Sequence, residues 1–257
     1  MPEIPDLNIF RRNLAKNLVG KKLSQLTVVN PRRMKSPESD FKAAFEGQKL
    51  TGINRIGKEL HFKFENGHEL GVHLMLHGTM YWYQNTNENK FTILELLFDD
   101  GTGLAITDWQ KAVLVTLDPK VSEAPDAMDM PDGYLHIALK GVSRPIKSVL
   151  TDGKTVQGIG NAYVDEILYA ARISPFSKAN KIPKAKVDDL IKAITTVLID
   201  AEHHISKNFP DTITEKERDF LQVHRPKQKV TLSGEPILIS EIDKRKTYYT
   251  KGQELFE

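Results

Sequence analysis

The sequence of 257 residues contains no cysteine, and this absence limits its chemistry first. Without thiols the chain forms neither disulfides nor thiolate metal sites, and it has no cysteine nucleophile. Eight histidines remain as possible metal ligands, but the adjacent pair His203-His204 would diverge on a helix. We therefore predict that the protein uses no metal and no other cofactor.

Long hydrophobic runs and a strong net charge are also missing. No run approaches the ~18 apolar residues of a membrane span. Charges interrupt the amino terminus from Glu3 onward, so we expect no signal peptide. The formal net charge is only +2, but the segment from Leu221 to Lys251 holds seven Lys/Arg against three acids, a net +4. Such a run is typical of a solvated face and also suits contact with phosphates.

The first half of the chain predicts a helix followed by many short strands. Apolar residues at helical spacing predict a helix from Pro5 to Val19, ended by Gly20. β-like runs then predict strands over Leu23–Val29, Leu50–Ile56, Glu59–Phe64, Glu69–Leu76, Met80–Tyr83, Thr92–Phe98, Leu104–Thr107 and Ala112–Thr116, interrupted by a short helix over Asp40–Phe45. Many short strands at even spacing are typical of a β-sandwich or a flattened barrel.

A change of pattern separates this half from the rest. Residues 118–132 hold three prolines, several acids and few large apolar residues, which indicates a linker. Beyond it apolar residues recur at helical spacing, most regularly over Pro183–His203, and β-like runs return over Lys229–Leu232, Pro236–Ile242 and Thr247–Thr250. We therefore expect an α+β protein in which a β-rich domain precedes a helical one.

The segment from Gly158 to Pro175 carries the most specific signal. Its two leading glycines predict a tight turn, and Asn161 would then cap the following helix, with Asp165 and Glu166 near the first turn. Helical spacing predicts one buried face, formed by Tyr163, Ile167, Ala170 and Ala171. A glycine-led helix N-terminus suits a phosphate, although such turns also simply join helices. The Asn161 side chain could serve either the cap or the phosphate.

Several motifs together resemble the formamidopyrimidine-DNA glycosylase/endonuclease VIII family. Residues 158–175, with Gly-Ile-Gly-Asn, Tyr, Asp-Glu-Ile-Leu, Ala and Ile-Ser-Pro in order, are similar to the helix–two-turns–helix signature of that family. The opening Met-Pro-Glu-Ile-Pro-Asp resembles its amino terminus, and Arg-Ile-Gly-Lys-Glu-Leu over residues 55–60 its lysine segment. Residues 73–78 and Thr107-Asp108 are weaker matches. The resemblance extends from residue 2 to about residue 253.

The resemblance implies a covalent chemistry for the amino terminus. If Met1 is removed, the nitrogen of Pro2 becomes a secondary amine, and an α-amino group has a pKa of about 8. Such an amine can attack a sugar C1′ and form an iminium. In the resemblance Glu3 carries protons for this reaction, as general acid and then base, and Lys58 contacts the DNA backbone and assists catalysis.

The resemblance also implies a set of DNA contacts. Asn161 would hold phosphate near the damaged nucleotide, His73 is a further DNA-binding candidate, and Arg245 would grip phosphates from a C-terminal finger. The zinc-binding cysteines of that finger are missing, and the residues near their places are Val230, Ser233, Thr250 and Gly252. We therefore expect the zincless form of the finger, a β-hairpin held by packing alone.

The residues that would fill the void left by an extruded base depart from the family pattern. Leu76 fits the first of these roles. The usual Asp-Pro-Arg-Arg-Phe-Gly is here Asp-Trp-Gln-Lys-Ala-Val over residues 108–113, so Gln110 replaces an arginine and Ala112 a phenylalanine. Trp109 is a candidate substitute wedge, with Lys111 beside it as a further DNA contact. These changes leave the preferred lesion and the activity itself open.

The resemblance implies four segments and one partner. The segments are a β-sandwich catalytic domain (1–118), a linker (119–133), a helix–two-turns–helix DNA-binding domain (134–224) and a zincless finger (225–257). The partner is damaged double-stranded DNA, bound by a monomer in the bacterial cytoplasm, at the nucleoid, with no membrane contact. The implied function is a DNA glycosylase with abasic-site lyase activity.

Two alternatives stay open at this point. The first is a relative that binds damaged DNA without cutting it, which the altered residues at 110 and 112 favour. The second is a ribosome-associated protein that uses the two-helix motif on RNA. That alternative leaves the β-rich domain, Pro2 and Glu3 unexplained.

Overall fold

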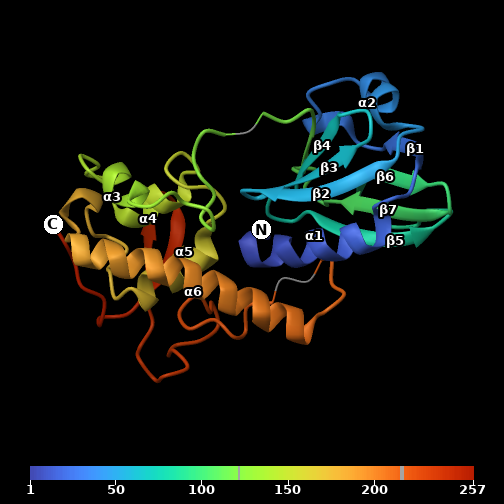
Figure 1. The fold of residues 1–257 in the computed structure, drawn as a ribbon. Coiled ribbons are helices and arrows are strands. Elements are labelled where there is room, and N and C mark those ends of the chain that lie inside the picture. Colours follow the sequence, from blue (N-terminus) through green and yellow to red (C-terminus); the bar gives the residue numbers. More distant parts are fainter. Residues whose placement is uncertain (121, 215–216) are drawn as a thin grey trace. The chain divides into compact units, whose positions relative to one another are not determined.

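The computed structural model describes residues 1–120, 122–214 and 217–257 and divides into two compact units (Figure 1). The first unit is Met1–Val121 with Ile205–Lys216, and the second is Ser122–His204 with Glu217–Glu257. Within the second unit the backbone of Gln157 pairs with Pro125 and Ala127, at 2.9 and 3.0 Å. Residues 125 and 127 of the predicted linker thus pack in this unit, and residue 121 lies outside the described residues. The four-segment division stays a prediction.

The first unit contains two α-helices and two antiparallel sheets. One sheet has the order β1-β6-β7-β5 and the other β2-β3-β4-β8. The helices are α1 (Ile4–Leu18) and α2 (Glu38–Phe45), and the strands are β1 (Leu23–Val28), β2 (Leu50–Ile56), β3 (Glu59–Phe64), β4 (Glu69–His73), β5 (Thr79–Gln84), β6 (Thr92–Phe98), β7 (Thr102–Thr107) and β8 (Leu114–Leu117). The predicted β-sandwich is thereby confirmed.

One hydrophobic core unites α1 and both sheets. The apolar stripe of α1 is fully buried, and it packs in the same cluster as inward-facing residues of the sheets, among them Leu26, Leu96, Phe62 and Val72. Along β3 every second side chain, those of Leu60, Phe62 and Phe64, lies in this core, as a two-layer β structure requires. The core therefore fixes the first residues of the chain to a rigid body, because α1 begins at Ile4.

Three of the predicted strands differ from the observed ones for reasons that the structure shows, and other strand ends differ by one or two residues. The strand predicted to reach Leu76 ends at His73, because the chain turns there and Met75 adopts a φ of 53°. The strand predicted from Ala112 begins at Leu114, because the carboxylate of Asp108 accepts the N–H groups of Ala112 and Val113. The strand predicted over 229–232 is absent from this described segment, where Val230 makes only a single bridge to Pro236.

The second unit is mainly helical and carries a small hairpin. Its elements are α3 (Tyr134–Ala138), α4 (Ile146–Thr151), α5 (Asn161–Ala170), a 3₁₀ turn at Ala179–Lys181, α6 (Lys184–Asn208), β9 (Leu238–Ile242) and β10 (Arg245–Tyr249). Helix α6 extends beyond the predicted His203 and ends in the first unit. The predicted α+β class is confirmed. Among the described residues, no helix is both long and apolar enough to span a bilayer.

Helix α5 differs from its prediction in two ways. Gly160, with φ −115° and ψ −167°, occupies the N-cap position, so Asn161 is the first helical residue and not the cap. The helix is buried over all residues from Ala162 to Tyr169, whereas Ala170 is exposed. The expectation of a single buried face was therefore wrong, and its acidic residues Asp165 and Glu166 lie inside the unit.

Candidate active site and nucleic-acid interface

The amino terminus is held in place by a cap on α1. Pro2 is buried, and Glu3 is the N-cap residue with only 3% of its surface exposed. The backbone N–H of Glu3 donates to Oδ2 of the fully buried Asp6 at 2.8 Å. This bond satisfies one of the free donors at the helix start and fixes the residue that follows Pro2. An amine at residue 2 would thus sit on an ordered backbone.

Lys58 lies in the tight turn between β2 and β3, in the same unit. Gly57 before it adopts a φ of 56°, which a residue with a Cβ rarely adopts. Arg55 ties this turn to α1, since its guanidinium donates to the carbonyl of Gly57 at 2.9 Å and to Oδ1 of Asn8 at 2.7 Å. The turn that presents the half-exposed Lys58 is therefore anchored to α1, the helix that directly follows Pro2 and Glu3.

His73, at the end of β4, is influenced by the charges of both Lys58 and the amino terminus. Burial lowers its pKa, and the positive charges of Lys58 and of the amino terminus lower it further against the opposing charge of Glu59. Its Nδ1 accepts the N–H of Met75 at 3.1 Å, which leaves the proton of the neutral ring on Nε2. His73 is therefore a neutral imidazole at pH 7 with an N–H available as a donor.

Two neighbouring loops of the first unit present the predicted wedge residues. Asp108, which is 1% exposed, organises one loop by accepting N–H bonds from Gln110, Ala112 and Val113, at 2.7–3.0 Å. Trp109, Gln110 and Lys111 are exposed on this loop. Leu76, on the other loop, is also exposed, and the ring of its neighbour His77 lies 5.0 Å from that of Trp109.

The close approach of the two loops depends on a glycine. A Cβ on Gly78 would collide with the carbonyl of Leu74 and with the side chain of Val113, so only glycine fits between them. The exposed fraction is 58% for both Leu76 and Trp109, a large value for such apolar side chains. The structure therefore exposes Leu76 and Trp109 on two loops that meet at His77 and Trp109, with Gln110 next to Trp109 in the chain.

In the second unit, Asn161 and Arg245 lie on elements that touch each other. The Asn161 side-chain amide donates to the carbonyl of Lys246 at 3.0 Å, which links the start of α5 to β10. Arg245 is the first residue of β10 and is exposed. It follows Asp243 and Lys244, whose φ values of 51° and 60° form the tight turn of the hairpin.

The hairpin is held by polar contacts as well as by packing, which corrects the expectation of packing alone. The carboxylate of Glu235 accepts the hydroxyl of Tyr169 at 2.8 Å and pairs with Arg172 at 3.1 Å. The Tyr169 hydrogen bond, aided by Thr250 and Arg172, lowers the pKa of Glu235. Within the described residues no group of three or more His, Asp and Glu could hold a metal ion.

The supporting roles of several residues were not predicted from the sequence. Asp6 and Asp108 are buried and accept backbone N–H groups of a helix start and a loop; an Asp in the first turn of a helix, or just before a turn, is a signal that could have indicated these roles. Lys147 is fully buried beside Asp165, and Glu166 accepts three backbone N–H groups of residues 222–224. The contacts of Lys147 and Glu166 join residues far apart in the chain, so no local sequence pattern indicates them.

Comparison with known proteins identifies the same family in both halves of the chain. The model of the formamidopyrimidine-DNA glycosylase N-terminal domain matches residues 1–114, and that of the formamidopyrimidine-DNA glycosylase H2TH domain matches residues 121–208. A formamidopyrimidine-DNA glycosylase of Enterococcus faecalis is 35% identical over 213 residues, which cover 77% of this chain and 75% of that protein.

Solved structures agree with this result along nearly the whole chain. The Lactococcus lactis Fpg in complex with DNA containing an abasic site has a TM-score of 0.87 and 25% identity, and the match covers 98% of this chain and 100% of that one. The same protein with DNA containing FAPY-dG has a TM-score of 0.86 and 25% identity, covering 96% and 98%.

Proposed function

The chain belongs to the formamidopyrimidine-DNA glycosylase family, and on this premise we propose that it excises damaged bases and cleaves the resulting abasic site through an iminium on Pro2. Membership makes it a DNA glycosylase of base-excision repair. The observation that carries the finer proposal is the ordered amino terminus, where Glu3 is bonded to buried Asp6 beside Pro2.

The proposed chemistry starts after removal of Met1. The lone pair of the Pro2 nitrogen attacks C1′ of the nucleotide, the bond from C1′ to the base breaks, and the base leaves with a proton. Opening of the sugar ring gives an iminium between the Pro2 nitrogen and C1′. The iminium acidifies the C2′ hydrogen, so loss of that proton expels the 3′ phosphate and cuts the strand. Glu3 supplies and removes protons in these steps.

The remaining site residues bind DNA in this proposal. Lys58 and the neutral His73 bind phosphates from the first unit, and Asn161 and Arg245 bind phosphates from the second. Leu76 and Trp109 fill the void left by the extruded base. Gln110 faces the opposite base, and Lys111 adds a charge to the same loop. We propose damaged duplex DNA as substrate, acted on by a monomer at the bacterial nucleoid without metal or other cofactor.

The altered loop at residues 108–113 favours a second candidate function. Without the arginine and phenylalanine of the family pattern, the protein could recognise damage and leave it uncut. A 5′-labelled duplex with one lesion, incubated with protein free of Met1, separates the two functions. The proposal predicts strand cleavage without alkali and its loss in Glu3→Gln. Binding without any cleavage supports the second function, and cleavage only after alkali refutes the lyase step.

A further inference from the structure

A buried ion pair lies beneath the finger of the second unit. Nζ of Lys147, on α4, is 2.8 Å from Oδ1 of Asp165, on α5, and the two side chains are 1% and 0% exposed. Lysine is almost never fully buried unless it is paired, because removing a charge from water is costly. Removal of either residue would leave the other as an unpaired buried charge, so each side chain stabilises the other in its buried position.

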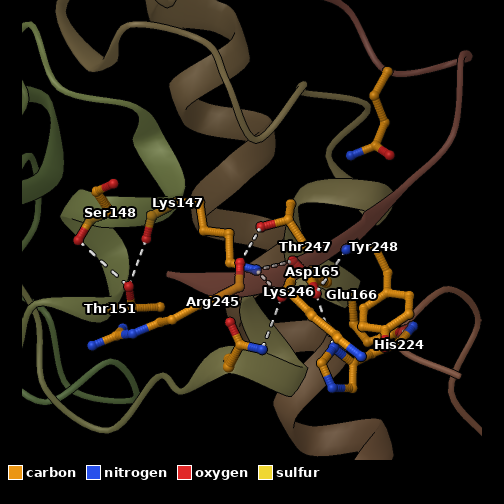
Figure 2. Close-up of polar contacts among 12 residues, drawn as sticks. Lys147, Ser148, Thr151, Asp165, Glu166, His224, Arg245, Lys246, Thr247 and Tyr248 are labelled. Carbon is orange, nitrogen blue, oxygen red and sulfur yellow. Dashed lines mark hydrogen bonds and ion pairs between the residues drawn. The ribbon is translucent and has the colours of Figure 1, made fainter. Parts of the chain in front are cut away.

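The ion pair is completed by groups from the finger and from the segment before it. Oδ2 of Asp165 is 2.8 Å from Nδ1 of His224 and accepts the backbone N–H of Tyr248 at 3.2 Å. Nζ of Lys147 also donates to the carbonyl of Lys246 at 3.1 Å (Figure 2). Two helices, the segment around residue 224 and strand β10 therefore meet at one pair of charges.

The contacts on β10 bear directly on the two predicted phosphate-binding residues. The carbonyl of Lys246 accepts from Lys147 and from the side chain of Asn161, at 3.1 and 3.0 Å. Arg245 is the adjacent residue of the chain, and Figure 2 shows it beside this group of contacts. The same ion pair thus sets both the path of β10 at Arg245 and the hydrogen bond that Asn161 makes.

A two-stranded hairpin needs such support. An isolated hairpin is at best marginally stable in water, and this one has no cysteines with which to bind a stabilising metal. The contact of Glu235 with Arg172 lies at the other end of the finger and is partly exposed, with side-chain exposures of 29% and 49%. Exposed pairs contribute little, so the buried pair is the stronger anchor.

We propose that Lys147 and Asp165 are positioning residues for DNA binding, which hold β10 against α5 so that Arg245 and Asn161 can bind phosphates together. This inference rests on the proposed phosphate contacts of Arg245 and Asn161. The pair joins the hairpin to the helical body through backbone atoms of β10.

The test compares Lys147→Met with Arg245→Ala in the full-length protein, using duplex DNA that contains a tetrahydrofuran abasic analogue. We expect each variant to weaken binding about tenfold, as for loss of a charged hydrogen bond. We also expect each to reduce the slope of log K against log salt by about one ion. If Lys147 acts through Arg245 and Asn161, the double variant Lys147→Met/Arg245→Ala loses less affinity than the two single losses multiplied together.

Lys186→Met is the matched control, because it removes a lysine that is 3.9 Å from Asp189 on α6 of the same unit. It should leave affinity and salt slope unchanged. If Lys147→Met does not fold, Lys147→Met combined with Asp165→Asn removes both charges and is measured instead. Full additivity with Arg245→Ala, or an unchanged affinity in a folded Lys147 variant, overturns the proposal.

Amide hydrogen exchange separates the failure of this inference from the failure of the phosphate assignment. Loss of the ion pair between Lys147 and Asp165 should speed exchange of the Tyr248 amide proton, which is donated to the Asp165 carboxylate. It should leave exchange in β6 unchanged. If Arg245→Ala binds DNA like the wild type, the phosphate role fails whatever the exchange shows. Unchanged exchange at Tyr248 in the Lys147 variant shows that no anchor exists.

Discussion

Replacing Asp6 by alanine tests how far catalysis depends on an ordered amino terminus. The side chain of Asp6 accepts the N–H of Glu3 at 2.8 Å, and both residues are buried, with exposed fractions of 0% and 3%. Alanine removes the acceptor and leaves the Glu3 donor without that partner. The change touches neither the proposed nucleophile nor the proposed proton carrier, so any effect on the reaction acts through position.

The expected cost in stability is modest, whereas the expected cost in rate is large. Loss of a side chain that caps a helix start destabilises a protein by about 0.5–2 kcal/mol, which lowers the melting temperature of a chain of this size by a few degrees. A misplacement of about 1 Å at a reacting group can reduce a rate by as much as 10²-fold. We therefore expect the single-turnover rate of Asp6→Ala to fall at least about tenfold.

The assay is single-turnover cleavage of abasic-site DNA, with the melting temperature measured on the same samples. Asp6→Asn keeps a side-chain oxygen and should retain most of the rate. Asn30→Ala is the matched control, because Asn30 caps the 3₁₀ turn Pro31–Arg33 by accepting the N–H of Arg32 at 3.2 Å, away from the amino terminus. An Asp6→Ala protein with a wild-type rate would refute the reasoning.

Three further predictions concern DNA recognition and the finger. Because burial lowers the pKa of His73 below its usual value, its ring is neutral at pH 7.5 and above, so the ratio of wild-type to His73→Gln affinity should stay constant from pH 7.5 to 8.5; a ratio that falls toward one as pH rises would indicate a charged histidine. Chelators should leave activity and melting temperature unchanged, and stoichiometric zinc in the purified protein would contradict a metal-free finger. Since Gln110 offers both a donor and an acceptor and Ala112 cannot stack, we expect weak discrimination among opposite bases, and better activity on abasic sites, oxidised pyrimidines or further-oxidised guanines than on 8-oxoguanine in duplex. In a single-turnover panel of lesions against all four bases, efficient excision of 8-oxoguanine only opposite cytosine would contradict this.

The regular elements were predictable where one local pattern decided them. The strands over Glu59–Phe64 and Thr92–Phe98 have the predicted limits, because a turn bounds each run on both sides. The strand predicted from Ala112 was too early, because a buried carboxylate four residues away takes the N–H that a strand would use. Capture of backbone groups by side chains depends on the folded loop and leaves little trace in periodicity.

In the candidate site, too, residues marked by a local motif could be predicted, whereas contacts that depend on the fold could not. The motifs around Pro2, Lys58 and Asn161 could be found in the sequence because each is a short run of specific residues. The supporting contacts could not, since the ion pair between Lys147 and Asp165 joins residues 18 positions apart. Asp165 looked like a residue suited to the start of a helix, and only the fold shows that it is buried.

Borohydride trapping on abasic-site DNA tests the central claim most directly, because it converts an iminium into a stable covalent bond. We expect one adduct with protein that lacks Met1, located on Pro2 by peptide mapping. The yield should fall sharply in Pro2→Gly and in protein that retains Met1, where the Pro2 nitrogen is an amide. An adduct of wild-type yield in a Pro2 variant with a blocked terminus, or one mapped to Lys58, would contradict the claim.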